Sequence, residues 1–140
     1  MIFMKKAVLV LVALILSAFS ACGNAGPLDL TGDWKQSNPV LNLPVLNSNY
    51  QIATIGPDSI EIYWYNDDTE IKALYWAGSY TPPTKAVKEY TWDSVNDKEK
   101  TGESLLATGD ETKTFTYKDG VISYDVSALG LTQTVKLKRV

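Results

Sequence analysis

The chain has 140 residues, with 16 acidic and 13 basic side chains for a net charge of −3, one cysteine and no histidine. The length suits a single domain. The absence of histidine excludes Ser-His-Asp and Cys-His catalysis and the common zinc and copper sites. A single cysteine excludes an internal disulfide, and the acidic balance is poorly suited to binding nucleic acid. We therefore expect no metal, no cofactor and no nucleic-acid partner.

The N-terminal segment has the composition of an export signal. Lys5 and Lys6 precede an uncharged apolar run over residues 7–16, and small residues follow up to Cys22. This order is typical of a signal peptide, and residues 7–21 are too few for the roughly 20 that a membrane-spanning helix needs. We predict that residues 1–21 are removed, which leaves 11 basic and 16 acidic side chains and a net charge of −5.

The residues at the predicted cleavage site, Phe19-Ser20-Ala21-Cys22, resemble the bacterial lipobox. In that family a diacylglycerol is attached to the cysteine before cleavage, and the position of Phe19 usually holds an aliphatic residue. The resemblance implies that Cys22 becomes a lipidated first residue and anchors the chain at the extracytoplasmic face of the cell membrane, since two acyl chains hold firmly. Residues 22–30, which include glycine and proline, are predicted to be a short tether.

Residues 31–140 are predicted to form one all-β domain. From residue 50 onward, short runs of alternating apolar and polar residues are separated by turn formers. After a first strand near residues 30–35 and an irregular segment at 36–49, we expect strands at residues 50–55, 59–65, 71–80, 87–95, 103–108, 111–118, 121–126 and 131–140, with a polar loop at 96–102. Eight or nine antiparallel strands at this spacing are typical of an up-and-down barrel or a β-sandwich. We favour the barrel, because the connections are short and closure removes exposed strand edges.

One hairpin is defined by its turn and by its faces. Asp119-Gly120 suits the two-residue type I′ turn, which places Lys118 opposite Val121 and Tyr117 opposite Ile122. A slip of one residue would invert both faces, so the register is fixed. On the last strand we expect Leu131, Val135 and Leu137 to face inward.

The two ends of the predicted domain resemble a lipocalin-like (calycin) barrel. Gly32-Asp33-Trp34 matches the Gly-x-Trp start of that family, in which the tryptophan plugs the closed end and a basic residue of the last strand packs over it. The resemblance implies structural roles for Gly32 and Trp34. It also implies that Arg139, the only arginine, stacks on the tryptophan.

Aromatic residues are concentrated between residues 63 and 92. Adjacent Tyr-Trp pairs place rings on both faces of two successive strands, so one ring of each pair is core and the other faces outward. Outward rings could form a stacking platform for a ligand or a contact patch for a protein, although ordinary cross-strand pairing would give the same pattern. The candidate ligand- or partner-binding residues are Tyr63, Tyr65, Tyr75, Trp76, Tyr80 and Trp92.

Carboxylates do not form a catalytic pattern in the sequence. Glu61, Glu89, Glu103 and Asp125 fall on predicted strands, but no spacing selects a pair of the kind that glycoside hydrolysis needs. The acidic groups at 67–70 and 96–99 do not follow the calcium-loop spacing and suit turns. We therefore expect no catalytic residues, and a carboxylate-based hydrolase is the minor alternative.

The layout of signal, lipobox, short tether and one β-domain resembles the small β-rich lipoproteins of bacterial chromosomes and prophages. The leading interpretation is a monomeric, membrane-anchored, non-enzymatic binding module. By analogy alone, a phage-derived member could obstruct DNA entry of a second phage, as in superinfection exclusion. The alternative is a lipocalin-like carrier that holds a small apolar ligand inside the barrel.

Overall fold

The computed structural model describes residues 26–38, 48–128 and 130–140. Cys22, the predicted signal peptide and most of the irregular segment at 36–49 lie outside the described residues. The described elements are β1 (Gly32–Gln36), β2 (Asn49–Ile55), β3 (Ser59–Asn66), β4 (Lys72–Ser79), β5 (Glu89–Val95), α2 (Lys98–Thr101), β6 (Thr112–Lys118), β7 (Val121–Ala128) and β8 (Leu131–Arg139).

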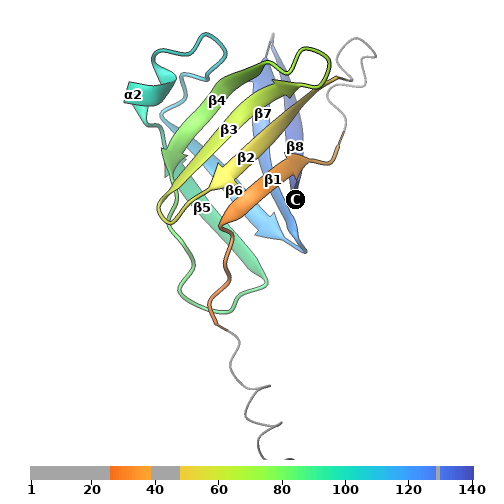
Figure 1. Ribbon diagram of the computed structural model, residues 1–140. Coiled ribbons are helices and arrows are strands. Elements are labelled where there is room, and N and C mark those ends of the chain that lie inside the picture. Colours follow the sequence, from red (N-terminus) through yellow and green to blue (C-terminus); the bar gives the residue numbers. More distant parts are fainter. Residues whose placement is uncertain (1–25, 39–47, 129) are drawn as a thin grey trace, which may run out of the picture.

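The eight strands form one antiparallel sheet in the order β4-β3-β2-β1-β8-β7-β6-β5. The first and last strands pair with each other, with Trp34 opposite Arg139. The two strands at the ends of this order, β4 and β5, meet at an isolated bridge between Gly78 and Asn96, which we call the seam. The sheet is thus curled into a nearly closed barrel (Figure 1), which confirms the predicted up-and-down barrel over the β-sandwich.

Local turn chemistry and face alternation fix the predicted hairpin. Asp119 and Gly120 have φ angles of 51° and 81°, as both central residues of a type I′ turn require, and Lys118 pairs with Val121 as expected. On β8, Val135 and Leu137 are buried as predicted. Leu131 is instead exposed, because it starts the strand at the rim, next to the β7–β8 turn.

The chain between β5 and β6 differs from the prediction. Residues 103–108 do not form a strand, and the loop predicted at 96–102 contains the single helical turn α2. After α2 the chain follows the free edge of β4: the Ser104 hydroxyl donates to the Leu74 carbonyl at 2.8 Å, and the Thr108 amide donates to the Tyr75 carbonyl at 3.1 Å. This segment therefore covers part of an edge that would otherwise be open.

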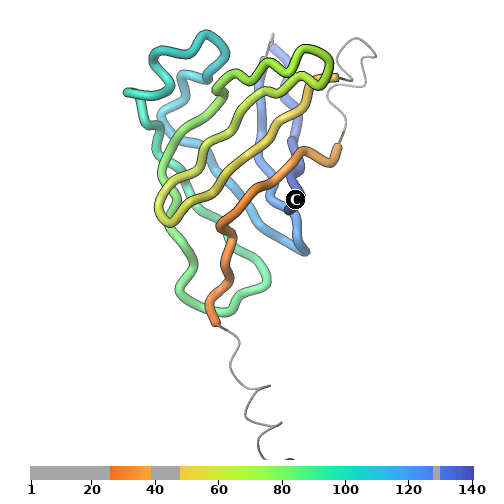
Figure 2. The backbone as a smooth tube through the Cα atoms, in the orientation of Figure 1, coloured from red at the N-terminus to blue at the C-terminus, as the bar shows by residue number. Residues whose placement is uncertain are grey.

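The packed fold begins before residue 31. Leu30 is fully buried in the core, Leu28 packs against it, and the Leu28 amide donates to the Lys85 carbonyl at 3.1 Å. Figure 2 shows this segment rising into the barrel from below, beside the β4–β5 connection. Residues 28–30 are thus part of the domain, which shortens the predicted tether.

The barrel interior has two different ends. In Figure 1 the lower end is the one at which the N-terminal segment enters, and α2 lies at the upper end. Large apolar side chains, among them Trp34, Ile55 and Ile60, fill the lower end. The upper end lies where β1 and β5 finish and β2 and β6 begin. Among the described residues, the strands contribute the buried polar side chains of Gln36, Gln51, Ser94 and Lys113 there.

Candidate functional site

Four of the six aromatic candidates are core residues. Tyr75, Trp76, Tyr80 and Trp92 are at most 5 % exposed. Tyr80 and Trp92 lie edge to face with ring centroids 5.1 Å apart, and Trp92 stacks on Phe115 at the same separation. The prediction that these four belong to an outward contact surface is therefore wrong, since they pack inside the barrel.

A β-bulge explains why the adjacent residues Tyr75 and Trp76 are both buried. On β3 and β4, Ile62 lies opposite Trp76 while the next residue, Tyr63, lies opposite Leu74, so Tyr75 is an extra residue in β4. An extra residue interrupts the strict alternation of faces. Tyr75 consequently meets the inward-facing Trp64, with ring centroids 5.9 Å apart.

The remaining two candidates, Tyr63 and Tyr65, are half-buried on the outer face of β3. The Lys72 ammonium lies 4.0 Å from the centre of the Tyr63 ring, and the Tyr65 ring lies 5.5 Å from that of Tyr50. The Tyr63 hydroxyl donates to Glu61 at 2.8 Å. These two tyrosines are the outward members of the Tyr-Trp-Tyr run, and they form a tyrosine face with Tyr50.

Trp34, Arg139 and Gly32, the residues expected to be structural, lie close together at the lower end. The Arg139 guanidinium lies 4.7 Å from the centre of the Trp34 ring and donates to the carbonyls of Thr31 and Asp29 at 2.5 and 2.7 Å. Gly32 has a φ of 126°, and a Cβ there would lie 3.0 Å from Arg139 Nη1. Glycine is needed at this position for both its backbone conformation and the close approach of the arginine.

A lysine lies inside the upper end. The Lys113 residue is 8 % exposed, and its ammonium donates to the Asp125 carbonyl at 2.8 Å. The rings of Tyr75, Trp76 and Tyr124 surround it, with centroids 5.3, 5.8 and 5.9 Å away. Burial lowers the pKa of Lys113, and the carboxylates of Asp110 and Asp125 oppose that shift. The Asp110 carboxylate stands 4.0 Å from the ammonium and is largely in solvent.

A buried glutamine lies beside the same ring system. Gln51 is 0 % exposed, and its Oε1 accepts a hydrogen bond from the Tyr124 hydroxyl. Its Nε2 has no hydrogen-bond partner, while its backbone amide donates to Gln36 Oε1 at 2.9 Å. An unpaired buried amide donor costs about 1–3 kcal/mol. We call Gln51, Lys113 and Tyr124, with Tyr75 beside them, the upper site.

Lys113, Gln51 and Tyr124 are not among the site residues predicted from the sequence. The sequence held a signal for Lys113, because it lies on the same face of its strand as the aromatic residues Phe115 and Tyr117, in alternation with threonines. Gln51 likewise lies on the same face of its strand as Ala53 and Ile55, although a glutamine is usually exposed to solvent.

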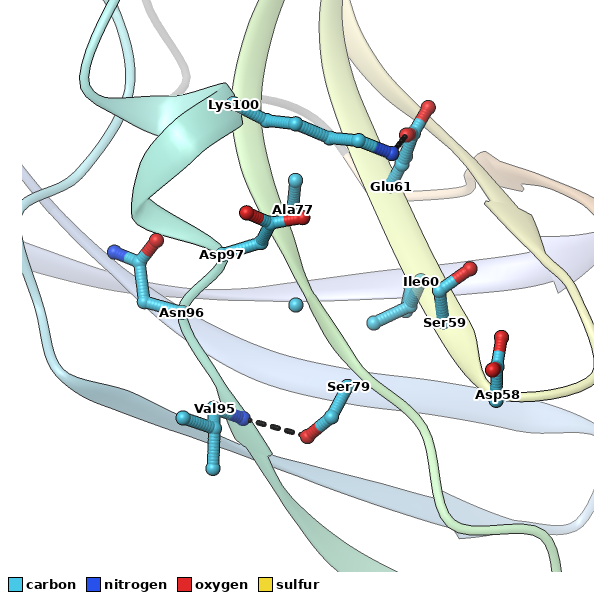
Figure 3. Close-up of a pocket in the computed structure, with 11 residues that line it drawn as sticks. Asp58, Ser59, Ile60, Glu61, Ala77, Ser79, Val95, Asn96, Asp97 and Lys100 are labelled. Atoms are coloured by element: carbon cyan, nitrogen blue, oxygen red, sulfur yellow. Dashed lines mark hydrogen bonds and ion pairs between the residues drawn. The ribbon is translucent and has the colours of Figure 1, made fainter.

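A groove of about 480 Å³ lies on the outer surface at the seam (Figure 3). Lys100 of α2 reaches over β4 to Glu61 of β3, with 2.8 Å between Nζ and Oε1. The Val95 amide donates to the Ser79 hydroxyl at 2.9 Å and ties the two edge strands together below the bridge. Asp58 and Asp97 also line the groove.

Glu61 in this groove is held in its ionised form. The hydrogen bonds from Lys100 and then Tyr63 hold the pKa of Glu61 below its usual value. A general acid near neutral pH needs a raised pKa, so Glu61 is unsuited to that role. Within the described residues, no group of three or more His, Cys, Asp or Glu side chains could hold a metal ion.

In the part of the chain that the structure describes, no helix has the length and apolar character required to cross a membrane. Comparison of the chain with protein-family models, with curated proteins and with solved structures gives no match.

Proposed function

We propose that this chain is a non-enzymatic binding protein of the small bacterial lipoprotein type, anchored through Cys22, whose barrel takes a small molecule at its upper end. The observation that carries the proposal is the pair of buried, incompletely bonded donors in the upper site, Lys113 and Gln51. Polar groups that converge in an otherwise apolar interior are typical of small-molecule sites. The burial of four aromatic candidates counts against an aromatic contact surface.

The proposed anchor would orient the barrel. The chain enters the fold at Leu28, at the lower end, and the stretch from Cys22 to Leu28 reaches at most about 20 Å. The end closed by Trp34 and Arg139 would therefore lie near the membrane. The upper site would point away from the membrane, where a ligand could arrive from the surroundings.

Replacing Cys22 with serine tests the anchor. We expect the Cys22→Ser protein to move from the membrane fraction to the soluble fraction of producing cells, because serine cannot form the thioether. The measurement is immunoblotting of both fractions after a high-salt wash. Ser17→Ala is the matched control, since it keeps a small residue in the same segment, and it should stay with the membrane. A Cys22→Ser protein that remains bound after the wash would contradict lipid anchoring at this residue.

Native mass spectrometry of residues 23–140, purified from producing cells, tests the carrier. We expect a mass above that of the bare chain, and we expect the excess to disappear when the protein is denatured. A bare mass would count against the carrier and favour a protein partner on the tyrosine face, which crosslinking at Tyr63 and Tyr65 would then identify.

A further inference from the structure

We infer that the upper site binds a small carboxylate, whose two oxygens accept hydrogen bonds from Lys113 Nζ and Gln51 Nε2. This inference rests on the proposed carrier function and names the chemical class of its ligand. Its basis is a buried cation with spare donors, a buried amide donor without a partner, and the ring of Tyr124 beside both.

Lys113 lacks the partners that a buried ammonium normally has. It has three N–H donors, and the Asp125 carbonyl takes one at 2.8 Å. The Asp110 carboxylate, at 4.0 Å, is at the limit of an ion pair and is largely exposed to water. A buried cation is costly unless it is both paired and hydrogen-bonded. A ligand carboxylate would supply the missing charge and acceptors together.

Gln51 offers the second donor from the opposite wall. Lys113 lies on β6 and Gln51 on β2, and these strands stand four places apart in the eight-strand order. Both side chains point into the interior. Tyr124 on β7 faces Lys113 with its ring and donates its hydroxyl to Gln51 Oε1. That hydrogen bond fixes the amide, so Nε2 is the group left for a ligand.

The unsatisfied groups select an acceptor rather than a cation. Gln51 Oε1 already accepts from Tyr124, and Gln36 Oε1 accepts from the Gln51 backbone amide. The groups that remain, Nζ and Nε2, are both donors. The rings of Tyr75 and Trp76 next to the ammonium give flat apolar walls that suit a carboxylate with an aromatic or aliphatic body.

The test compares carboxylates with neutral analogues of the same shape. Residues 23–140, which contain the whole described fold, are titrated calorimetrically at pH 7 with benzoate and benzamide, and with octanoate and octanamide. We expect at least one acid to bind with a dissociation constant below about 1 mM, and at least about tenfold more tightly than its amide.

Variants then assign the binding to the upper site. Lys113→Met should weaken the acid at least about tenfold and leave the amide unchanged. Lys118→Met is the matched control, because Lys118 lies on the same strand but is exposed and paired with Glu89, and it should bind like the wild type. If Lys113→Met does not fold, the ratio of the acid and amide dissociation constants for the wild type still tests whether a carboxylate is preferred.

Three outcomes would overturn the inference. Equal binding of acid and amide, or an acid affinity unchanged in Lys113→Met, would show that no carboxylate is held at Lys113. A mass excess in native mass spectrometry would leave the carrier function standing in both cases. If neither acid binds, the carboxylate assignment is wrong, and a bare native mass in addition would contradict the carrier as well.

Discussion

Replacing Gly78 with alanine is expected to lower the free energy of unfolding by about 3 kcal/mol, at the upper end of the cost of overpacking a core. A Cβ at this position would lie 2.3 Å from the Ser94 hydroxyl, 2.7 Å from Trp76 Nε1 and 2.7 Å from the Val95 carbonyl. Two of these atoms are joined by the hydrogen bond from Trp76 to Ser94, 3.0 Å long and buried. The third is backbone and cannot swing away, so the two edge strands would have to separate.

Urea denaturation followed by tryptophan fluorescence measures the effect. Gly109→Ala is the matched control, because a Cβ there meets nothing within 4 Å and the backbone is not left-handed; its stability should stay within about 0.5 kcal/mol of the wild type. A Gly78→Ala protein as stable as the control would mean that the strands at the seam adjust freely. The bridge between Gly78 and Asn96 would then not fix barrel closure.

Stability is expected to fall steeply as the pH rises above about 10, the value at which tyrosines of the unfolded chain ionise. Burial raises the pKa of Tyr124 well above that value, and burial followed by the Asp110 charge raises that of Tyr75. The unfolded chain therefore loses protons that the folded barrel keeps. Each such tyrosine lowers the free energy of unfolding by about 1.4 kcal/mol per pH unit until its folded pKa is reached.

Lys113 changes the free energy of unfolding in the opposite direction, and over a lower pH range. Its folded pKa lies below the unfolded value near 10.4, so between these two values the unfolded chain holds more protons. Stability should rise with pH across that window and then fall as the tyrosines ionise. Urea titrations from pH 7 to 12, with tyrosinate absorbance recorded in parallel, measure both the rise and the fall of the free energy of unfolding.

Two variants separate the contributions of the buried tyrosines and of Lys113 to the pH dependence of stability. Tyr124→Phe should flatten the fall above pH 10, and Lys113→Met should remove the rise below it while leaving the fall in place. A wild-type profile that is flat up to pH 12 would contradict the burial of these phenols in a closed interior.

Features set by neighbouring residues were predictable from the sequence. The type I′ turn at Asp119-Gly120 needs two positive φ angles in series, and few residue pairs adopt them. The faces of β8 follow from period-two alternation at Val135 and Leu137. The contact between Trp34 and Arg139 joins residues distant in sequence, and it was expected only from the resemblance to lipocalin-like barrels.

The predictions that were wrong concern residues whose structure depends on contacts with residues distant in the sequence. Residues 103–108 were predicted to form a strand but follow the edge of β4 instead, because the carbonyls of Leu74 and Tyr75 accept hydrogen bonds there. The bulge at Tyr75 turned two adjacent aromatics inward, although simple alternation would have put one of them outside.

By itself, the sequence determined most of the strands and the main turns, because these depend on backbone preference and on alternation within one strand. It left the upper site undetermined. Gln51, Lys113 and Tyr124 come from β2, β6 and β7, and they meet because the sheet curls until β1 pairs with β8 and Gly78 reaches Asn96. Only the closure of the tertiary structure decides which polar side chains leave water and converge, because burial depends on what the opposite wall of the barrel supplies.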